Sequence, residues 1–400
     1  MRFRAALPSL TVAAALLAAA CGQGASNAPS ASSASTAASG TTAPAASSAH
    51  PSVFRLAGLA GLTGRFANYG QEFQRGGQLA VDQLNSSGGV LGAKVELSFQ
   101  DTANDPVETV RLARQAASDS SVAAVIGPND SASGLALAPV LPNLKIVGML
   151  GGQAPWNGSF NPWTFRTQLV VTLAAAPLAS ALSKLNVKSM AITYAVDNDF
   201  SKRESEALQS SLKTAGIQVP DVEAYKTGDT DFSIQVTNII AKHPDAWYLS
   251  GTAKESGGII LQARRAGFKG LFVGGYSILQ DPSIMSLTNN EAAGAITWGQ
   301  TPYTSTRPQM VKFFTAYKEK FNATPGDSAV AAYTSVLLLA NAATTAKSLT
   351  DRQAIRDALG NTKGFAAPWS DYTYKGSGDN TTPTVIMFKV NEKGQAVPLP

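Results

Sequence analysis

The sequence has few of the residues that bind metals or carry out acid–base catalysis. Its 400 residues include one cysteine, Cys21, and two histidines, His50 and His243. One thiol excludes a disulfide framework and a cysteine-rich metal centre, and two imidazoles leave little for zinc binding or histidine-based catalysis. The chain also lacks a phosphate-binding loop and a pairing of nucleophile with base. We therefore expect a protein that is not an enzyme and that holds no metal and no cofactor.

Charged residues are also scarce, at 15% of the chain, and their signs nearly balance, with 32 Lys and Arg against 27 Asp and Glu. Basic residues form no run of five or six, so the composition gives no support for a nucleic-acid partner. Hydrophobic residues make up 44% of the chain, which is a globular composition, and the length suits about two or three domains of roughly 150 residues. The sequence therefore predicts a folded protein that does not bind nucleic acid.

The N-terminus has the pattern of an export signal. Arg2 and Arg4 precede a run of small, mostly apolar residues, 5–20, which is too short to span about 30 Å of hydrocarbon. Residues 16–22, Leu-Leu-Ala-Ala-Ala-Cys-Gly, resemble a bacterial lipobox, whose cysteine receives a lipid and becomes the first mature residue. The resemblance implies a lipoprotein signal peptide over residues 1–20 and a lipid on Cys21. The alternative is an ordinary signal peptide cleaved at the alanine run.

The next segment, residues 22–50, carries no charge and no large apolar side chain. It buries too little surface to offset the entropy of ordering, so residues 21–50 are predicted to be a lipidated cysteine followed by a disordered tether. A tether of this length has a typical reach of about 30 Å, enough to hold a folded body away from a membrane surface. The folded part is expected to begin near Pro51.

Short β-like runs alternate with amphipathic helical stretches from residue 53 onward. Residues 53–59 read as a strand, and residues 122–127 form an apolar run typical of a strand buried on both faces. A second series with the same alternation ends in a strand at 271–274, and the stretch from 295 adds two long helices and a final β-like run. This pattern predicts an α/β protein with two doubly wound lobes. Ligands of such sheets bind at the carboxyl ends of the strands, so a cleft between the lobes is the expected site.

Several motifs occur in the order and at the spacing of a known family. They lie at residues 58–70, 79–92, 100–106, 125–128, 262–267 and 317–325. The second of them ends in Asn-Ser-Ser-Gly-Gly-Val-Leu-Gly. Together they resemble the type I periplasmic solute-binding proteins of branched-chain amino-acid ABC importers, over residues 53–395. The resemblance implies the fold of that family, in which two doubly wound α/β lobes are joined by a three-stranded hinge.

The resemblance also implies how the chain divides between the lobes. Crossings are expected near Thr167, Thr297 and Thr384. The N-terminal lobe would then consist of residues 53–167 plus 298–384, and the C-terminal lobe of residues 168–297 plus 385–400. Closure about the hinge would bury a ligand between the lobes.

In the amino-acid binders of this family, a serine after the third strand and a turn after the fourth hold the carboxylate of the ligand. Ser131 falls on the serine position. The preceding Asn129 and Asp130 either reach the expected cleft or belong to a solvated loop. Gly152 and Gln153 occupy the turn, where Gln153 keeps a polar side chain but not the small hydroxyl usual there. A serine before a helix is also an ordinary N-cap, so both interpretations of Ser131 stay open.

The second lobe departs from the family at the residue that holds the ammonium of the ligand. Tyr276 stands where the family has a glutamate, and a phenol cannot neutralise a buried ammonium. Tyr69 and Phe200 align with aromatic cleft positions, and Thr252 stands where a further tyrosine is often found. The expected ligand is a small carboxylate or amide with an apolar or aromatic body. The alternative is a branched-chain or other amino acid, whose amine Glu255, Asp130 or a backbone carbonyl would hold.

Four acidic residues resemble the carboxylate pairs of glycosidases: Asp197, Asp199, Glu204 and Glu206. They lie on or just before the start of a predicted helix, where acids are favoured by the helix dipole. We therefore assign them a structural role.

The function expected from these features is that of an extracytoplasmic substrate-binding lipoprotein of an ABC importer. Its expected partners are a small-molecule ligand and an ABC permease, and the lipid would anchor a monomer to a bacterial membrane, in the periplasm or at the cell surface. A ligand sensor of the same fold is the alternative.

We expect that Cys21→Ser releases the protein from membranes as soluble, folded protein, because the thiol is the attachment point of the lipid. Fractionation of membranes and mass spectrometry of the mature N-terminus check this. A mature chain that begins elsewhere, with Cys21 unmodified or removed, would contradict it.

Overall fold

A computed structural model of the protein describes residues 53–64, 66–152, 161–276, 278–280, 283–302, 305–376 and 378–399. The predicted signal peptide, Cys21, the tether and Gln153 lie outside these residues.

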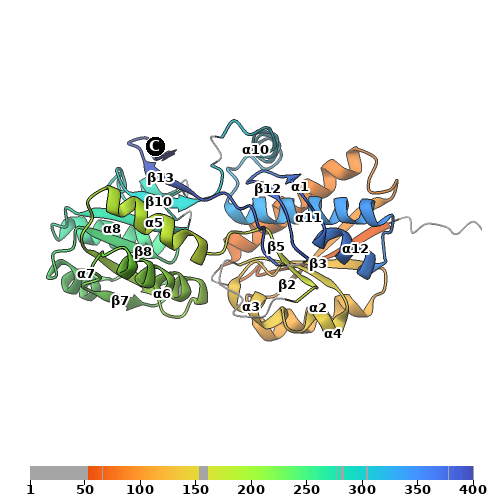
Figure 1. Ribbon diagram of the computed structural model, residues 1–400, viewed down its shortest axis with the longest axis horizontal. Helices are drawn as coiled ribbons and strands as arrows, with labels where there is room; N and C mark the ends of the chain where they lie inside the picture. The colour runs from red at the N-terminus through yellow and green to blue at the C-terminus, as the bar shows by residue number, and fades with distance from the viewer. Residues whose placement is uncertain are drawn as a thin grey trace, which may run out of the picture. The chain divides into compact units, whose positions relative to one another are not determined.

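Five parallel strands form the first sheet, in the order β2-β1-β3-β4-β5. They are β1 (Val53–Ala60), β2 (Lys94–Asp101), β3 (Val122–Ile126), β4 (Val147–Leu150) and β5 (Thr164–Arg166). Every residue of β3 and β4 is buried, because helices cover both faces of the sheet. Figure 1 shows α1 (Ala67–Ser86) and α11 (Asp327–Ala346) on one side of it and α2 (Pro106–Ser118) and α4 (Leu141–Leu144) on the other. The predicted α/β class and its parallel sheets are confirmed.

Helices from two distant parts of the chain pack on this sheet. The short helix α3 (Ser131–Leu137) follows β3, whereas α10 (Pro308–Phe321), α11 and α12 (Arg352–Gly360) come from the C-terminal part of the sequence. A Cβ atom on Gly76 of α1 would lie 2.0 Å from the backbone oxygen of Ala329 in α11, so the close approach of the two helices requires glycine. Helix α11 is long and apolar enough to cross a membrane, but most of it is buried in the core.

The second sheet has seven strands in the order β14-β13-β10-β9-β8-β6-β7. They are β6 (Met190–Ala195), β7 (Val222–Tyr225), β8 (Ala246–Ser250), β9 (Leu271–Tyr276), β10 (Ile296–Gly299), β13 (Ile386–Val390) and β14 (Ala396–Pro398). The strands from β10 to β7 are parallel. β13 pairs antiparallel with β10, and β14 pairs antiparallel with β13. The sequence prediction ended the ninth strand at Gly274, but β9 continues through Tyr276, because its backbone also pairs with β10.

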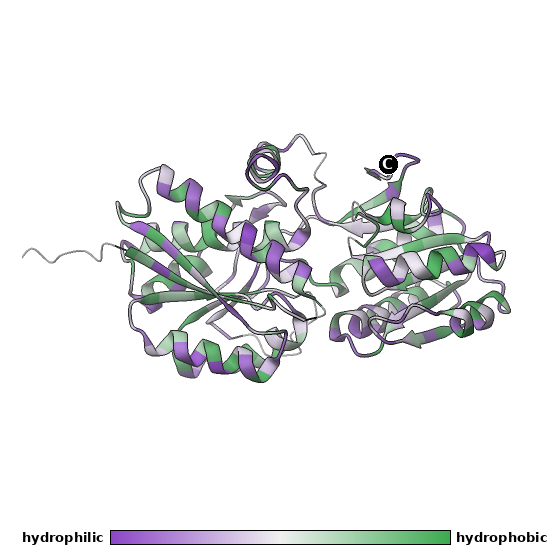
Figure 2. Ribbon diagram, turned by 180° about the vertical axis from the view of Figure 1, so that it is seen from behind, coloured by the Kyte–Doolittle hydropathy of each residue, from purple (hydrophilic) through white to green (hydrophobic). Residues whose placement is uncertain are grey.

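Side-chain alternation along β8 separates two hydrophobic layers. Trp247 and Leu249 pack with α7 (Ser233–Ile240) and α8 (Ala253–Arg265), and Tyr248 packs on the other face with α5 (Thr172–Lys184) and α6 (Asp199–Thr214). The short helices η1 (Ile278–Gln280) and α9 (Ile284–Leu287) follow β9. Figure 2 shows hydrophobic residues along the strands and hydrophilic residues interspersed on the helices.

The chain passes between the two sheets three times: after β5, after β10 and before β13. The second crossing, expected near Thr297, begins after Gly299. Thr297 is inside β10 and pairs with Phe388 of β13, so the chain leaves the second sheet after Gly299.

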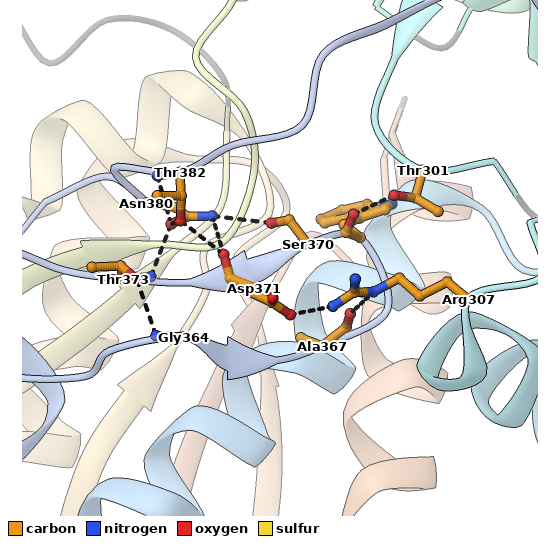
Figure 3. Close-up of polar contacts among 10 residues, drawn as sticks. Thr301, Arg307, Gly364, Ala367, Ser370, Asp371, Thr373, Asn380 and Thr382 are labelled. Carbon is orange, nitrogen blue, oxygen red and sulfur yellow. Dashed lines mark hydrogen bonds and ion pairs between the residues drawn. The ribbon is translucent and has the colours of Figure 1, made fainter.

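A short hairpin, β11 (Phe365–Ala366) and β12 (Asp371–Tyr372), hydrogen-bonds to residues near each crossing. The hydroxyl of Tyr372 donates to the carbonyl of Thr167 at 2.7 Å. Arg307, which follows the second crossing, donates to the carbonyl of Ala367 and pairs with Asp371 at 2.5 Å (Figure 3). Asn380, which precedes the third crossing, donates to the carbonyl of Asp371 (Figure 3). The hairpin therefore connects the three crossings to one another.

Arg166, the last residue of β5, is only 1% exposed and forms a buried ion pair with Asp379. Its Nε and Nη2 atoms donate to the two carboxylate oxygens at 2.6 and 3.0 Å, which is the bidentate geometry that suits a guanidinium. Burial lowers the pKa of Arg166, and the charge of Asp379 opposes that effect. The pair joins the first crossing to the segment that leads into the third.

We expect Asp379→Ala to lower the free energy of unfolding by about 3–5 kcal/mol, because it leaves a buried guanidinium without its counter-charge. Asp371→Ala is the matched control, since it breaks an Arg–Asp pair whose side chains are 26% and 57% exposed and should cost at most about 1 kcal/mol. Urea unfolding of both variants measures the difference. Equal losses would contradict this account of Arg166.

Glu204 of α6 is a buried acid that connects the ends of β8 and β9. Its Oε1 accepts from the backbone N–H of Tyr276 at 2.9 Å, and its Oε2 hydrogen-bonds to the hydroxyl of Ser250. Burial raises the pKa of Glu204 from 4.5 to about 7, against the lowering effect of these bonds. The sequence assigns Glu204 a structural role as an acid favoured by the dipole near a helix start; the structure shows that it is 2% exposed and is hydrogen-bonded to the ends of two strands.

The bonds around Ser250 fit a protonated Glu204. The Ser250 hydroxyl lies 3.2 Å from the carbonyl of Ser201, to which it can donate its single proton. A protonated Oε2 can then donate to Ser250, so both contacts are satisfied at once.

Because the pKa of Glu204 is higher in the folded state, the folded protein holds this proton more tightly than the unfolded chain. Its contribution to stability is complete below about pH 4.5 and is lost as the pH rises through about 7, by on the order of 3 kcal/mol. Glu204→Gln keeps an acceptor for Tyr276 and a donor for Ser250, so we expect its stability to exceed that of the wild type at pH 8 and to converge with it near pH 4.5. Chemical unfolding across this pH range tests the difference. The control is Glu206→Gln, on the exposed side of the same helix; an equal effect there would refute the assignment.

Candidate functional site

A cavity of about 250 Å³ lies where the carboxyl ends of strands from both sheets meet. Seven of the eight residues predicted from sequence line it: Tyr69, Asn129, Ser131, Gly152, Phe200, Thr252 and Tyr276. The eighth, Gln153, lies outside the described residues. The volume suits a small ligand.

The end of the β3–α3 loop and the first residue of α3 supply three consecutive lining residues, Asn129, Asp130 and Ser131. The Asn129 side-chain oxygen accepts from the backbone N–H of Gly61 at 2.9 Å, which fixes the loop against the end of β1. Asp130, not Ser131, is the N-cap of α3, since its Oδ1 accepts from the backbone N–H of Ser133 at 2.9 Å. The N-cap interpretation of Ser131 is therefore wrong, and Ser131 is the first residue of the helix.

Gly152 follows β4 and lies directly against Ser131. A Cβ atom on Gly152 would lie 2.7 to 2.8 Å from the Cα, N and Oγ of Ser131, and its φ is +85°, so the turn requires glycine. Its N–H donates to the Gln168 side-chain oxygen at 2.6 Å, and its carbonyl accepts from Nη1 of Arg166 at 3.1 Å. The buried ion pair Arg166–Asp379 therefore also sets the position of this part of the cavity.

Tyr276 lines the cavity while it belongs to the core of the second sheet. Its ring packs edge-on against Trp298 with centroids 5.1 Å apart, and Gln300 donates to its hydroxyl at 3.1 Å. Burial and the nearby charge of Asp327, at the start of α11, raise the pKa of Tyr276 well above its usual value. The phenol therefore remains neutral at physiological pH.

The loop after β8 supplies Gly251, Thr252 and Ala253. The hydroxyl of Thr252 hydrogen-bonds to the carboxylate of Glu255, which also accepts from the backbone N–H of Gly228 at 2.9 Å. Glu255 is not among the residues that line the cavity. Its carboxylate orders this loop, so the suggestion that it could hold an amine is not supported by its position.

Sequence reasoning missed the lining residues that come from other parts of the chain. They are Phe66, Asn68 and Glu72 near the start of α1, Gln168, Asn198, Ile278 and the segment 324–328 before and at the start of α11. The sequence shows the motif that ends at Pro325, but no local feature of it indicates that it lines the cavity. Only the return of the chain to the first sheet brings it there.

Carboxylates are prominent among the lining residues, in the form of Glu72, Asp130 and Asp327. Burial raises the pKa of Asp130 above its usual value, although bonds from Ser133 and Asn104 oppose this effect. Among the residues that the structure describes, no group of three or more His, Cys, Asp and Glu side chains is placed to hold a metal ion.

The sequence matches the family model described as periplasmic binding protein over residues 53–395. The Leu/Ile/Val-binding protein BraC3 of Rhizobium johnstonii is 27% identical over 336 residues, which cover 83% of this chain and 90% of that protein. The Leu/Ile/Val-binding protein homolog 3 of Brucella melitensis is 26% identical, with 83% and 89% covered. Both relatives are named as binding proteins rather than enzymes.

Solved structures agree with these relatives in fold. The leucine-binding protein LivK of Thermotoga maritima has a TM-score of 0.77 at 25% identity and covers 86% of this chain and 97% of its own. The substrate-binding protein LivJ of Streptococcus pneumoniae, in complex with isoleucine, has a TM-score of 0.77 at 24% identity, with 87% and 100% covered. The family implies an extracytoplasmic location. This chain therefore belongs to the periplasmic binding protein family, as a type I substrate-binding protein of the branched-chain amino-acid ABC transporter kind.

Proposed function

We propose that this protein captures one small organic solute in the cavity and delivers it to an ABC permease in the membrane. The observation that supports this most directly is that residues from both sheets line a single cavity at the carboxyl ends of their strands. Open α/β sheets bind ligands at these ends. A lipid on Cys21 would keep the monomeric receptor near its permease.

The cavity walls support a solute with an apolar or aromatic body. Phe66, Tyr69, Phe200 and Tyr276 contribute aromatic rings. Aromatic side chains in a pocket bury the apolar surface of a ligand, and a few polar groups then set its orientation. Ser131 supplies a hydroxyl for the head group, which sequence reasoning gives as a carboxylate or an amide. A branched-chain amino acid remains the alternative, because the relatives named above are Leu/Ile/Val-binding proteins.

We further propose that each sheet with its helices forms one lobe, and that the lobes close on the solute by bending at the three crossings. The N-terminal lobe then consists of residues 53–167 and 300–384, and the C-terminal lobe of residues 168–299 and 385–400. These boundaries follow the predicted ones, except that the strand β10 belongs entirely to the second sheet.

A solute that binds this cavity should raise the melting temperature, since ligand at 100 times its Kd adds about 2.7 kcal/mol of stability. We expect a hit from a panel of amino acids, aromatic carboxylates, amides and short acids, with Phe200→Ala and Ser131→Ala weakening it. Loss of one hydrogen bond at Ser131 should cost about tenfold in affinity.

Ile234→Ala is the control for these variants, because Ile234 is 70% exposed on α7 and does not line the cavity. Small-angle scattering of free and saturated protein tests closure. Unchanged dimensions would refute hinge closure, and a panel without any melting shift would refute solute capture by this cavity.

A further inference from the structure

Asp130 lies beside Ser131, the residue expected to meet the head group of the solute, and both line the cavity. Its Oδ1 accepts from the N–H of Ser133 at 2.9 Å, and its Oδ2 lies 3.4 Å from the side-chain nitrogen of Asn104. Both partners are neutral. When Asp130 is ionised, its negative charge is therefore not neutralised by a positively charged partner.

The position of Asp130 changes what Ser131 can bind. An oxyanion at the start of a helix is held by backbone N–H groups of the first turn, but here the side chain of Asp130 already accepts from one of them, the N–H of Ser133. A solute carboxylate at Ser131 would also meet a second negative charge in a partly desolvated site, where repulsion between like charges is strong. The same carboxylate can accept a hydrogen bond from a solute N–H without that penalty.

We propose that Asp130 is a specificity-determining residue, which makes the cavity select solutes whose head group donates N–H hydrogen bonds and carries no negative charge. This inference rests on the proposed function and names the class of solute within it. Of the two head groups expected from sequence, it favours the carboxamide over the carboxylate. Burial raises the pKa of Asp130, and a solute N–H that donates to the carboxylate favours its ionised form against that effect.

Matched solutes that differ only in the head group test the proposal. The pairs are phenylacetamide with phenylacetate, benzamide with benzoate, and 4-methylpentanamide with 4-methylpentanoate, measured by calorimetry at pH 7.5. The wild type should bind the amide at least tenfold more tightly than the acid in at least one pair. In Asp130→Asn this preference should fall at least tenfold, chiefly through tighter binding of the acid, while the amide oxygen of asparagine still caps α3.

Asp105→Asn is the matched control. Asp105 caps α2 in the same way, by accepting from the N–H groups of Val107 and Glu108, but it does not line the cavity. It should leave the amide preference unchanged. Asp130→Ser removes the charge and retains a capping hydroxyl, so it should behave as Asp130→Asn does. Agreement between the two variants shows that the loss of charge, and not a defect in folding, changes the preference.

The proposal would be overturned by tighter binding of the acids by the wild type, by an unchanged preference in Asp130→Asn, or by no binding of any pair. Tighter binding of leucine than of leucinamide would also overturn it, and would at the same time uphold solute capture by the cavity. Failure of the proposed function is distinct, since it requires that no solute of the wider panel shifts the melting temperature.

Discussion

The buried guanidinium of Arg166 connects parts of this fold that lie far apart in the sequence. It ends β5, pairs with Asp379 from the far end of the sequence and donates to the carbonyl of Gly152 beside the cavity. A buried charge is costly unless it is paired and fully hydrogen-bonded. The same requirement therefore fixes the first crossing, the approach to the third crossing and the turn that lies against Ser131.

The second sheet uses a buried acid in a comparable place. Glu204 is hydrogen-bonded to the ends of β8 and β9, the two strands whose following residues supply Gly251, Thr252 and Ile278 to the cavity. Glu204 has neutral hydrogen-bonding partners where Arg166 has an ion pair, so burial raises its pKa to about 7. The two sheets thus hold their halves of the cavity by different electrostatic means. One depends on a permanent charge pair, and the other depends on a proton.

The α/β class, the parallel sheets and most element positions were predictable because periodicity and turn residues act locally. The family resemblance also led to seven residues that line the cavity. These residues lie near the ends of strands, and the order of the elements along the chain fixes where those ends are. Prediction from sequence was incomplete for residues whose role depends on side chains that are close to them in space. Ser131 is a possible N-cap from its sequence context, whereas Asp130 performs that role. The sequence explains Glu204 by the helix dipole, whereas the structure shows that it is buried and bonded to two strands.

The sequence by itself determined the alternation of strands and helices, the uncharged segment after Cys21 and the residue types that follow each strand, since these depend on composition and short-range spacing. Only the tertiary structure decided which residues meet in the cavity. The segment 324–328 and Gln168 reach it because the chain returns to the first sheet after two crossings and because Gln168 accepts from Gly152. It also decided the partners of Arg166 and Glu204, because the cost of a buried charge depends on groups far away in the sequence that packing brings within hydrogen-bonding distance.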